Sequence, residues 1–140
     1  MVFITGGAYQ GKLEYALERF KLNAGDVYYC NDGAAEAPEN KKIIYEIDKW
    51  ILALVKAEEN INAGTAASAG NAITAAGAAR ALIERNPDAI VICNDISCGV
   101  VPYDPVQRKW REAVGRAAAE LSRYSAEAVR LFCGIPAKLK

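Results

Sequence analysis

Short apolar runs alternate along this chain with segments in which apolar residues recur at helical spacing. Four runs are interpreted as strands: Val2–Thr5, Val27–Cys30, Ala89–Cys93 and Val129–Cys133. Short, continuously apolar runs of this kind are typical of strands that are buried on both faces of a parallel sheet. Together with the helical segments between them, they predict a three-layer α/β domain with a mostly parallel sheet.

Four further segments carry apolar residues three and four positions apart, as on one face of a helix. They are expected to start near Gly11, to run from Asn40 to about Asn60, to cover Ala63–Arg85 and to start again near Val106. Glycines weaken the first half of the third segment, so an order boundary or loop is expected near Gly64–Gly70. Trp50 and Trp110 fit the apolar stripes of their helices and are expected in the core. After the last strand, residues 134–136 are expected to turn the chain toward its terminus.

The composition is that of an ordinary globular protein, with 52% hydrophobic and 24% charged residues among 140. No linker or internal repeat interrupts the pattern, and residues 1–140 are interpreted as one domain. Seventeen basic residues balance seventeen acidic ones, so general nucleic-acid binding is not expected. No stretch has the roughly 18 apolar residues of a membrane-spanning helix, and the N-terminus lacks the features of a signal peptide. A cytoplasmic location without a membrane partner is expected.

The chain contains no histidine. This excludes mechanisms that use imidazole as a base, a nucleophile or a metal ligand. The cysteines Cys30, Cys93, Cys98 and Cys133 show no C-x-x-C spacing, so neither a zinc site nor a redox site is expected. Cys30, Cys93 and Cys133 lie in or at the end of apolar runs and are interpreted as small buried hydrophobic residues.

The segment after the first strand fits the motif G-x-x-x-x-G-K of phosphate-binding loops. Its residues are Gly6, Gly7, Ala8, Tyr9, Gln10, Gly11 and Lys12, followed by Leu13 where the motif has Ser or Thr. Backbone N–H groups and the helix N-terminus favour an anion there, and Lys12 reaches the β- and γ-phosphates. Leu13 lacks the hydroxyl that holds Mg²⁺ and continues the apolar stripe, as it would in an ordinary glycine-rich turn. The strand–loop–helix context favours nucleotide binding.

Asp95 lies just past the strand Ala89–Cys93. A carboxylate at the end of a parallel strand beside a phosphate loop is well placed to organise Mg²⁺. Asp95 and Lys12 are therefore the candidate catalytic residues, with Asp95 also the candidate metal ligand, and a turn-capping aspartate is the alternative. Asp32, in a similar place after the second strand, is the weaker candidate because it also fits a plain turn. Arg108, Lys109, Arg111 and Arg116 are interpreted as a solvated helix face from which one side chain could clamp a phosphate.

Four blocks of the chain resemble the adenosylcobinamide kinase / adenosylcobinamide-phosphate guanylyltransferase family. Residues 93–102 are similar to its signature Ser-Asn-Glu-Val-Gly-x-Gly-Ile-Val-Pro, and residues 108–112 with Gly115 and Arg116 to its Arg-Arg-Phe-Arg-Asp and Gly-Arg. Residues 134–140 are similar to its terminus Gly-Leu-Pro-Leu-x-Leu-Lys, and residues 3–8 with Gly11 and Lys12 to its phosphate loop. Residues 31–88 show no match.

The resemblance implies a RecA-like P-loop fold, usually as a homotrimer, that uses Mg²⁺ with ATP or GTP. It also implies a role in corrinoid (vitamin B12) nucleotide-loop assembly. There the family phosphorylates the aminopropanol hydroxyl of adenosylcobinamide and then transfers GMP from GTP through a histidine.

This chain departs from the family at several polar positions. Having no histidine, it is expected to lack guanylyl transfer. Leu13 replaces the hydroxyl ligand, Asp95 a glutamate, Ser97 a glycine, and Ala118 and Ala119 an Asn-Gln pair. Two interpretations follow: a kinase that has lost the transferase step, or a nucleotide- or corrinoid-binding protein without turnover. An unrelated small P-loop NTPase is a third.

Overall fold

The structure is a computed structural model that describes residues 1–33, 38, 41–62 and 74–140. Its elements, in chain order, are β1 (Val2–Gly6), α1 (Lys12–Phe20), a 3₁₀ turn (Ala24–Asp26), β2 (Val27–Tyr29), β3 (Ile43–Tyr45), α2 (Ile47–Asn62), α3 (Ala75–Arg85), β4 (Ile90–Asn94), α4 (Pro105–Tyr124), β5 (Glu127–Phe132) and β6 (Ile135–Lys138).

The described strands form one sheet in the order β2-β3-β4-β1-β5-β6. The pairings β2–β3, β3–β4, β4–β1 and β1–β5 are parallel, and β5–β6 is antiparallel. The central strand is β1, where Ile4 lies opposite Ile92 on one side and Val129 on the other. All three side chains are buried, as expected for a strand covered on both faces. The carboxyl ends of β1, β3 and β4 therefore meet at one edge of the sheet.

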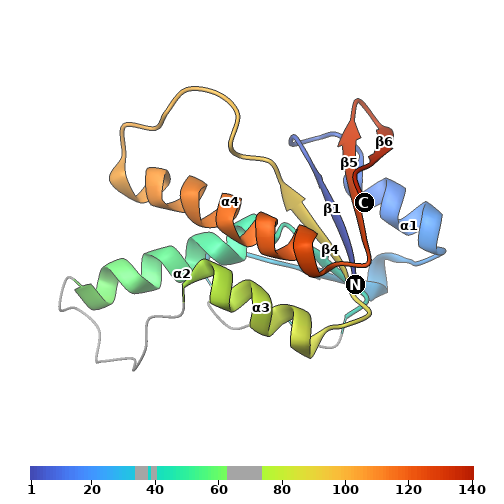
Figure 1. The fold of residues 1–140 in the computed structure, drawn as a ribbon, viewed down its shortest axis with the longest axis horizontal. Helices are drawn as coiled ribbons and strands as arrows, with labels where there is room; N and C mark the ends of the chain where they lie inside the picture. The colour runs from blue at the N-terminus through green and yellow to red at the C-terminus, as the bar shows by residue number, and fades with distance from the viewer. Residues whose placement is uncertain (34–37, 39–40, 63–73) are drawn as a thin grey trace.

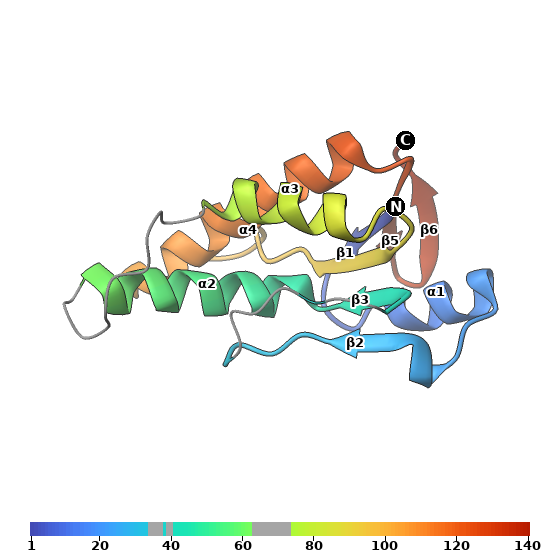
Figure 2. The ribbon, with the colours of Figure 1, turned by 90° about the horizontal axis from the view of Figure 1, so that it is seen from below.

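Helices cover both faces of this sheet. Figure 1 shows α1 on one side of the strands and α2, α3 and α4 on the other, and Figure 2 shows the same layers from below. Strand residues alternate between the two cores. Phe3 and Val91 pack with α2, α3 and α4, whereas Ile4 and Ile92 pack against α1. The predicted three-layer α/β fold with a mostly parallel sheet is confirmed.

Two of the sequence-based predictions about elements are wrong. The helix expected from Asn40 begins only at Ile47, because Ile43–Tyr45 is strand β3. Glu46 between them has a φ of 59°, a left-handed conformation through which a helix cannot run. The chain after Gly134 does not turn away but returns as the antiparallel strand β6. In consequence Cys133, which was expected to be buried, is exposed in the β5–β6 turn.

Other predictions hold with shifted ends. The predicted strands correspond to β1, β2, β4 and β5, and Trp50 is buried in the core as expected. The alanine-rich helix is found as α3, which Thr74 caps by accepting a hydrogen bond from the Gly77 N–H group. The loop expected near Gly64–Gly70 lies outside the described residues. Within the described part of the chain, no helix is long and apolar enough to cross a membrane.

Candidate functional site

The loop between β1 and α1 is folded around the side chain of Lys12. Lys12 Nζ donates a hydrogen bond of 2.6 Å to the Gly7 carbonyl oxygen, and only 3% of the residue is exposed. Gly11, the residue before α1, has a φ of 75°, a conformation that glycine adopts without strain. The Cys133 N–H group donates to Gln10 Oε1, so the β5–β6 turn supports the loop. The sequence GGAYQGK thus forms a lysine-centred loop at the start of a helix.

A cavity of about 340 Å³ opens beside this loop. Its lining comes from the loop, the start of α1 and the ends of β3 and β4: Ala8, Tyr9, Gln10, Gly11, Lys12, Glu14, Tyr45, Glu46 and Asn94. The cavity lies at the carboxyl ends of parallel strands, where ligands of open α/β sheets bind. The N–H groups in the first turn of α1 have no partner within the helix. The loop thus offers backbone donors and one lysine to an anion.

Two of the predicted loop residues are placed differently from the others. Tyr9 is fully exposed and has a φ of 58°, although it is among the residues that line the cavity. Leu13 does not line the cavity but packs against the core on the α1 side of the sheet. At position 13, only the backbone N–H group therefore remains for a phosphate.

Acidic residues missed by the sequence reading lie close to Lys12. Burial lowers the pKa of Lys12, and the negative charges of Asp48 and Glu46 oppose that shift. Asp48 is 3% exposed, and burial raises the pKa of its carboxyl group. Glu46 lines the cavity and forms an ion pair of 2.6 Å with Lys49. Glu46 directly follows β3, and Asp48 lies in the first turn of α2. They were missed because β3 was read as part of a helix, and a strand assignment for Ile43–Tyr45 would have revealed them.

Asn94, the last residue of β4, also belongs to this site. Its backbone N–H group donates to Asp48 Oδ1 at 3.0 Å, and its Nδ2 donates to Asp48 Oδ2 at 3.2 Å. Asp48 is in turn fixed from α4, because Trp110 Nε1 donates to the Asp48 carbonyl oxygen at 2.7 Å. The ends of β3 and β4 are thereby joined beneath the cavity.

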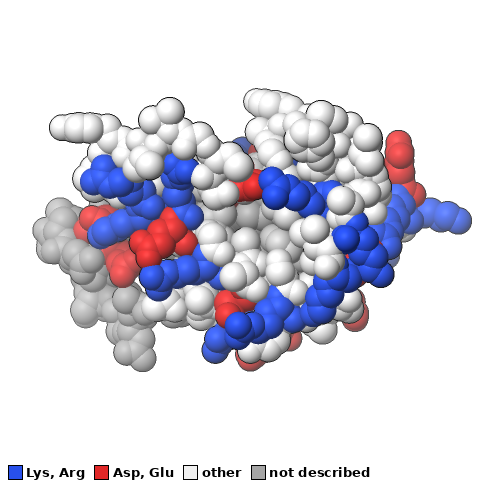
Figure 3. Space-filling view, turned by 45° about the horizontal axis from the view of Figure 1, so that its top comes forward, with Lys and Arg blue, Asp and Glu red and all other residues white. Residues whose placement is uncertain are grey.

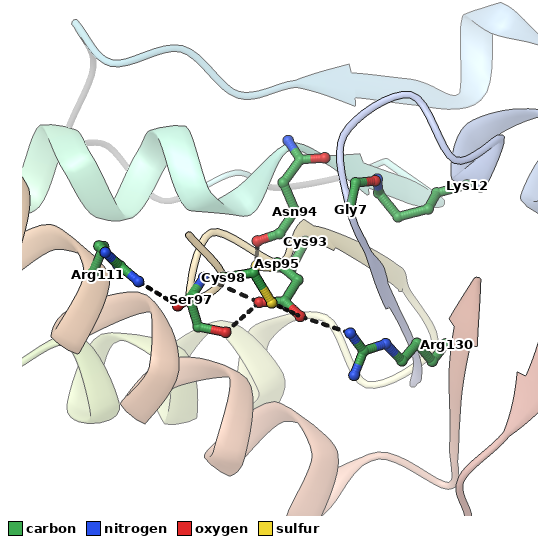
Figure 4. A network of polar contacts seen from close by, with 9 residues as sticks. All are labelled: Gly7, Lys12, Cys93, Asn94, Asp95, Ser97, Cys98, Arg111 and Arg130. Carbon is green, nitrogen blue, oxygen red and sulfur yellow. Dashed lines mark hydrogen bonds and ion pairs between the residues drawn. The ribbon is translucent and has the colours of Figure 1, made fainter. Parts of the chain in front are cut away.

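Asp95 lies on the other side of the sheet end. Its carboxylate accepts hydrogen bonds from Ser97 and from Arg130 Nη2, the latter at 3.0 Å, and Figure 4 shows it turned away from Lys12. The bonds from Ser97 and the charge of Arg130 lower the pKa of Asp95. The structure therefore does not bring the two predicted catalytic side chains together. The backbone link is nevertheless direct, because the Asp95 N–H group donates to the Gly6 carbonyl oxygen at 2.8 Å.

Asp95 borders a second cavity, of about 230 Å³, between the sheet and α4. Phe3, Cys93 and Val114 contribute an apolar floor, small residues of α4 form one wall, and Arg111 stands at the rim. On the face shown in Figure 3, a hollow with a mostly uncharged floor is bordered by basic and acidic side chains. The two cavities share a single lining residue, Asn94.

The basic residues of α4 serve local contacts. Arg108 and Arg111 donate to carbonyl groups of the loop between β4 and α4, at Pro102, Tyr103, Val100 and Ser97. Lys109 pairs with Glu59, and Arg116 with Glu112. Asp32 pairs with Lys56 at 2.6 Å. None of these side chains lines the cavity beside Lys12.

The cavity beside Lys12, called the phosphate-loop cavity from here on, is lined by side-chain oxygen atoms that suit Mg²⁺ bound to a nucleotide. In the described residues, no three acidic or cysteine side chains gather into a metal-binding cluster. Mg²⁺ does not require one, because it keeps several waters and takes one or two carboxylates together with the phosphates. The Glu46 carboxylate lines the cavity next to Lys12, and the Asn94 amide provides a further oxygen. Glu46 and Asn94 therefore fit Mg²⁺, whereas the apolar side chain of Leu13 offers it no ligand atom.

A comparison with models of protein families shows which family this chain matches. The model for cobinamide kinase / cobinamide phosphate guanyltransferase matches residues 33–139. The chain belongs to this family. It follows that the fold is a P-loop fold and that the family role lies in cobalamin biosynthesis, on nucleotide and cobinamide substrates. A search of curated proteins gave no match.

The family match extends beyond the motif blocks that carried the resemblance, but it does not include the phosphate loop. Residues 31–88 showed no resemblance by motif, yet the family match includes 33–88. β3 and the acids after it lie in this stretch. The phosphate loop, in contrast, precedes the matched residues. Its assignment rests on the sequence of residues 6–12 and on the buried Lys12.

Proposed function

We propose that this protein is a kinase that uses ATP or GTP to phosphorylate the hydroxyl of adenosylcobinamide and that it lacks guanylyltransferase activity. The observation that carries the proposal is the buried Lys12 within a glycine-rich loop, beside a cavity at the carboxyl ends of β1, β3 and β4. Phosphoryl transfer depends mainly on positioning and on neutralising charge. A chain without histidine is able to do both.

The loop from Gly6 to Leu13 holds the phosphates of the nucleotide in this proposal. Lys12 leaves the Gly7 carbonyl and contacts the β- and γ-phosphates, as the lysine of such loops does. Leu13 contributes its backbone N–H group alone. Bound Mg²⁺ supplies positive charge to the phosphate oxygens, and Glu46 and Asn94 are the side chains that would hold it. Asp95, the metal candidate of the sequence analysis, does not line this cavity but borders the one under α4.

We assign Asp95 instead to the hydroxyl of the acceptor. Its carboxylate borders the apolar cavity under α4, and its pKa is lowered, so it is ionised at neutral pH and accepts a hydrogen bond from an alcohol. The alcohol oxygen forms the new bond to the γ-phosphorus as the bond to the leaving nucleoside diphosphate breaks, and the alcohol proton passes to the Asp95 carboxylate. Because Asn94 is common to both cavities, donor and acceptor approach each other across the end of β4.

A second function is a nucleotide- or corrinoid-binding protein without turnover. The observation that favours it is the packing of Leu13 into the core, which removes a metal ligand. The separation of Asp95 from Lys12 in two cavities also favours a binding protein.

By analogy with the family, we propose that the protein acts in the cytoplasm as a homo-oligomer. A trimer is the form to test by light scattering.

The test is incubation with adenosylcobinamide, Mg²⁺ and either ATP or GTP, followed by mass spectrometry of the corrinoid. A kinase adds one phosphate and releases ADP or GDP. Lys12→Ala removes the reaction and nucleotide binding, whereas the control Lys42→Ala, at the opposite end of the sheet next to β3, retains both. Tight nucleotide binding without product identifies the binding protein. Equal nucleotide binding by wild type and Lys12→Ala contradicts the kinase and the nucleotide-binding protein and leaves only corrinoid binding.

A further inference from the structure

We propose that Asp48 is a positioning residue that holds the Asn94 amide with its oxygen, and not its nitrogen, facing the phosphate-loop cavity. The inference rests on the nucleotide-binding part of the proposed function. It does not require that phosphoryl transfer occurs.

The hydrogen bonds between the two residues determine the orientation of the amide. An ionised carboxylate only accepts hydrogen bonds, and an amide has distinct donor and acceptor ends. Because Asp48 Oδ2 accepts from Asn94 Nδ2 at 3.2 Å, the donor end of the amide is committed to Asp48. Figure 4 shows the amide oxygen of Asn94 on the side of Gly7 and Lys12. An amide of the opposite orientation would place two lone pairs against a carboxylate.

Asp48 is itself fixed by its surroundings. It lies in the first turn of α2, is 3% exposed and does not line the phosphate-loop cavity. Its Oδ1 accepts from the Asn94 N–H group at 3.0 Å, and its carbonyl oxygen accepts from Trp110 Nε1 at 2.7 Å. Burial raises the pKa of the Asp48 carboxyl group, and the hydrogen bonds from Asn94 oppose that shift. Asp48 therefore makes no direct contact with a ligand in that cavity, and Asn94 is the cavity residue to which it is hydrogen-bonded.

The orientation matters because of what occupies the cavity. Mg²⁺ is a hard cation that takes oxygen ligands and keeps bound waters, which are hydrogen-bond donors. The Asn94 oxygen suits either partner, whereas an NH₂ group at the same place suits neither. Groups that orient a metal-binding side chain commonly change metal affinity by about 10–100-fold when they are altered.

Asp48→Asn separates positioning from a purely structural role. The new amide has the shape of the aspartate, but its nitrogen is a donor. Asn94 re-forms the pair by rotating its amide through a half-turn, so that its oxygen accepts this bond and its nitrogen faces the cavity. The fold is then retained while the chemistry of the cavity changes. In the double variant Asp48→Asn/Asn94→Asp, a carboxylate at position 94 accepts the bond and again offers an oxygen to the cavity.

The experiment measures nucleotide affinity by calorimetry with a non-hydrolysable ATP or GTP analogue, with and without Mg²⁺. For Asp48→Asn we expect the strengthening of binding by Mg²⁺ to fall about tenfold or more, with affinity in EDTA and the unfolding temperature close to wild type. The double variant recovers the Mg²⁺ effect. Glu58→Gln, on the later part of α2, is the control for loss of one acidic charge and leaves both affinities unchanged.

Three outcomes contradict the inference. They are retention of the full Mg²⁺ effect by Asp48→Asn, an equal fall in its nucleotide affinity with and without Mg²⁺, and failure of the folded double variant to recover the Mg²⁺ effect. Should wild type bind Mg²⁺-nucleotide and transfer no phosphate, the kinase proposal fails while the role of Asp48 stands. If Asp48→Asn does not fold, comparison of Asn94→Asp with the double variant decides, since only the double variant restores a donor–acceptor pair.

Discussion

Asp95 pairs with Arg130, with 3.0 Å between Oδ2 and Nη2, and not with Lys12. The two residues expected to act together border different cavities, which share only Asn94. This separation divides the proposed reaction into a nucleotide side beside the phosphate loop and an acceptor side under α4.

The first prediction concerns the acceptor side. Asp95→Asn removes the charge that accepts the alcohol hydrogen bond, and a loss of about 10²–10⁴-fold in kcat is expected when such a group is removed. Nucleotide affinity should change less than twofold, because the side chain does not line the phosphate-loop cavity. Steady-state kinetics and calorimetry provide the two readouts. Asp88→Asn, at the amino end of β4, is the matched control. A large loss of nucleotide affinity in Asp95→Asn would return Asp95 to the metal side.

The acid stability of the protein should also depend on Asp95. Its pKa is lower in the folded state than the ordinary aspartate value of 3.8, through Ser97 and Arg130. A lowered pKa means that this carboxylate stabilises the fold above the unfolded-state pKa and that the contribution disappears as the pH falls through the folded-state pKa. Urea unfolding between pH 7 and pH 2.5 should therefore show a smaller acid-induced loss for Asp95→Asn than for wild type. Parallel curves would show that the pairing contributes nothing.

The loop before α1 depends on a glycine at the end of β1. A Cβ atom on Gly6 would lie 2.5 Å from the Leu131 carbonyl oxygen, and Gly6 has a φ of +150°. Gly6→Ala should therefore destabilise the protein by about 1–3 kcal/mol, as measured by urea denaturation.

Gly115→Ala is the matched control for Gly6→Ala. It lies in the middle of α4 with open space around the added methyl group. It should stabilise the protein by about 0.5–1 kcal/mol. Equal effects of the two substitutions would contradict the close approach of β1 and β5.

Cysteine reactivity gives an independent check of the fold. Burial raises the pKa of Cys30 to about 12 and that of Cys93 well above its usual value. The native protein should therefore react with iodoacetamide at the exposed Cys98 and Cys133 and spare Cys30 and Cys93. Peptide mass spectrometry over time measures the four rates. Fast labelling of Cys93 would show that the end of β4 is open to solvent.

The layers of the fold follow from the sequence because the central strands are short and uniformly apolar. The period-two alternation of β4 also carries information about the site. Successive side chains of a strand point to opposite faces, so Cys93 and Asp95 share one face and Asn94 belongs to the other. Lys12 lines the cavity on the side of Asn94. The alternation along the strand therefore separates Asp95 from Lys12. The prediction that joined Asp95 to Lys12 considered the edge of the sheet and not its two faces.

The acids near Lys12 were hidden for a different reason. Ile44, Ile47 and Ile51 stand at helical spacing although Ile44 belongs to β3 and the others to α2. The periodicity runs across the boundary because all three side chains enter the same core. Only the left-handed backbone of Glu46 separates the elements. A non-glycine residue in that conformation is not visible in the sequence, so Glu46 and Asp48 were taken as ordinary positions of a helix.

The central claim is that the protein transfers the γ-phosphate of a nucleotide and does not transfer GMP. The most direct test follows the γ-phosphate and the α-phosphate of the nucleotide separately. GTP labelled in the γ-phosphate and GTP labelled in the α-phosphate are incubated separately with the protein, Mg²⁺ and adenosylcobinamide, and both corrinoid and protein are analysed. ATP labelled in the γ-phosphate covers a preference for adenine. The account predicts that γ-label passes to the corrinoid, that this transfer is lost in Lys12→Ala, and that α-label appears on neither corrinoid nor protein, because no histidine is present to carry GMP. A stable GMP–protein adduct, or binding of nucleotide with no transfer of the γ-label, would contradict it.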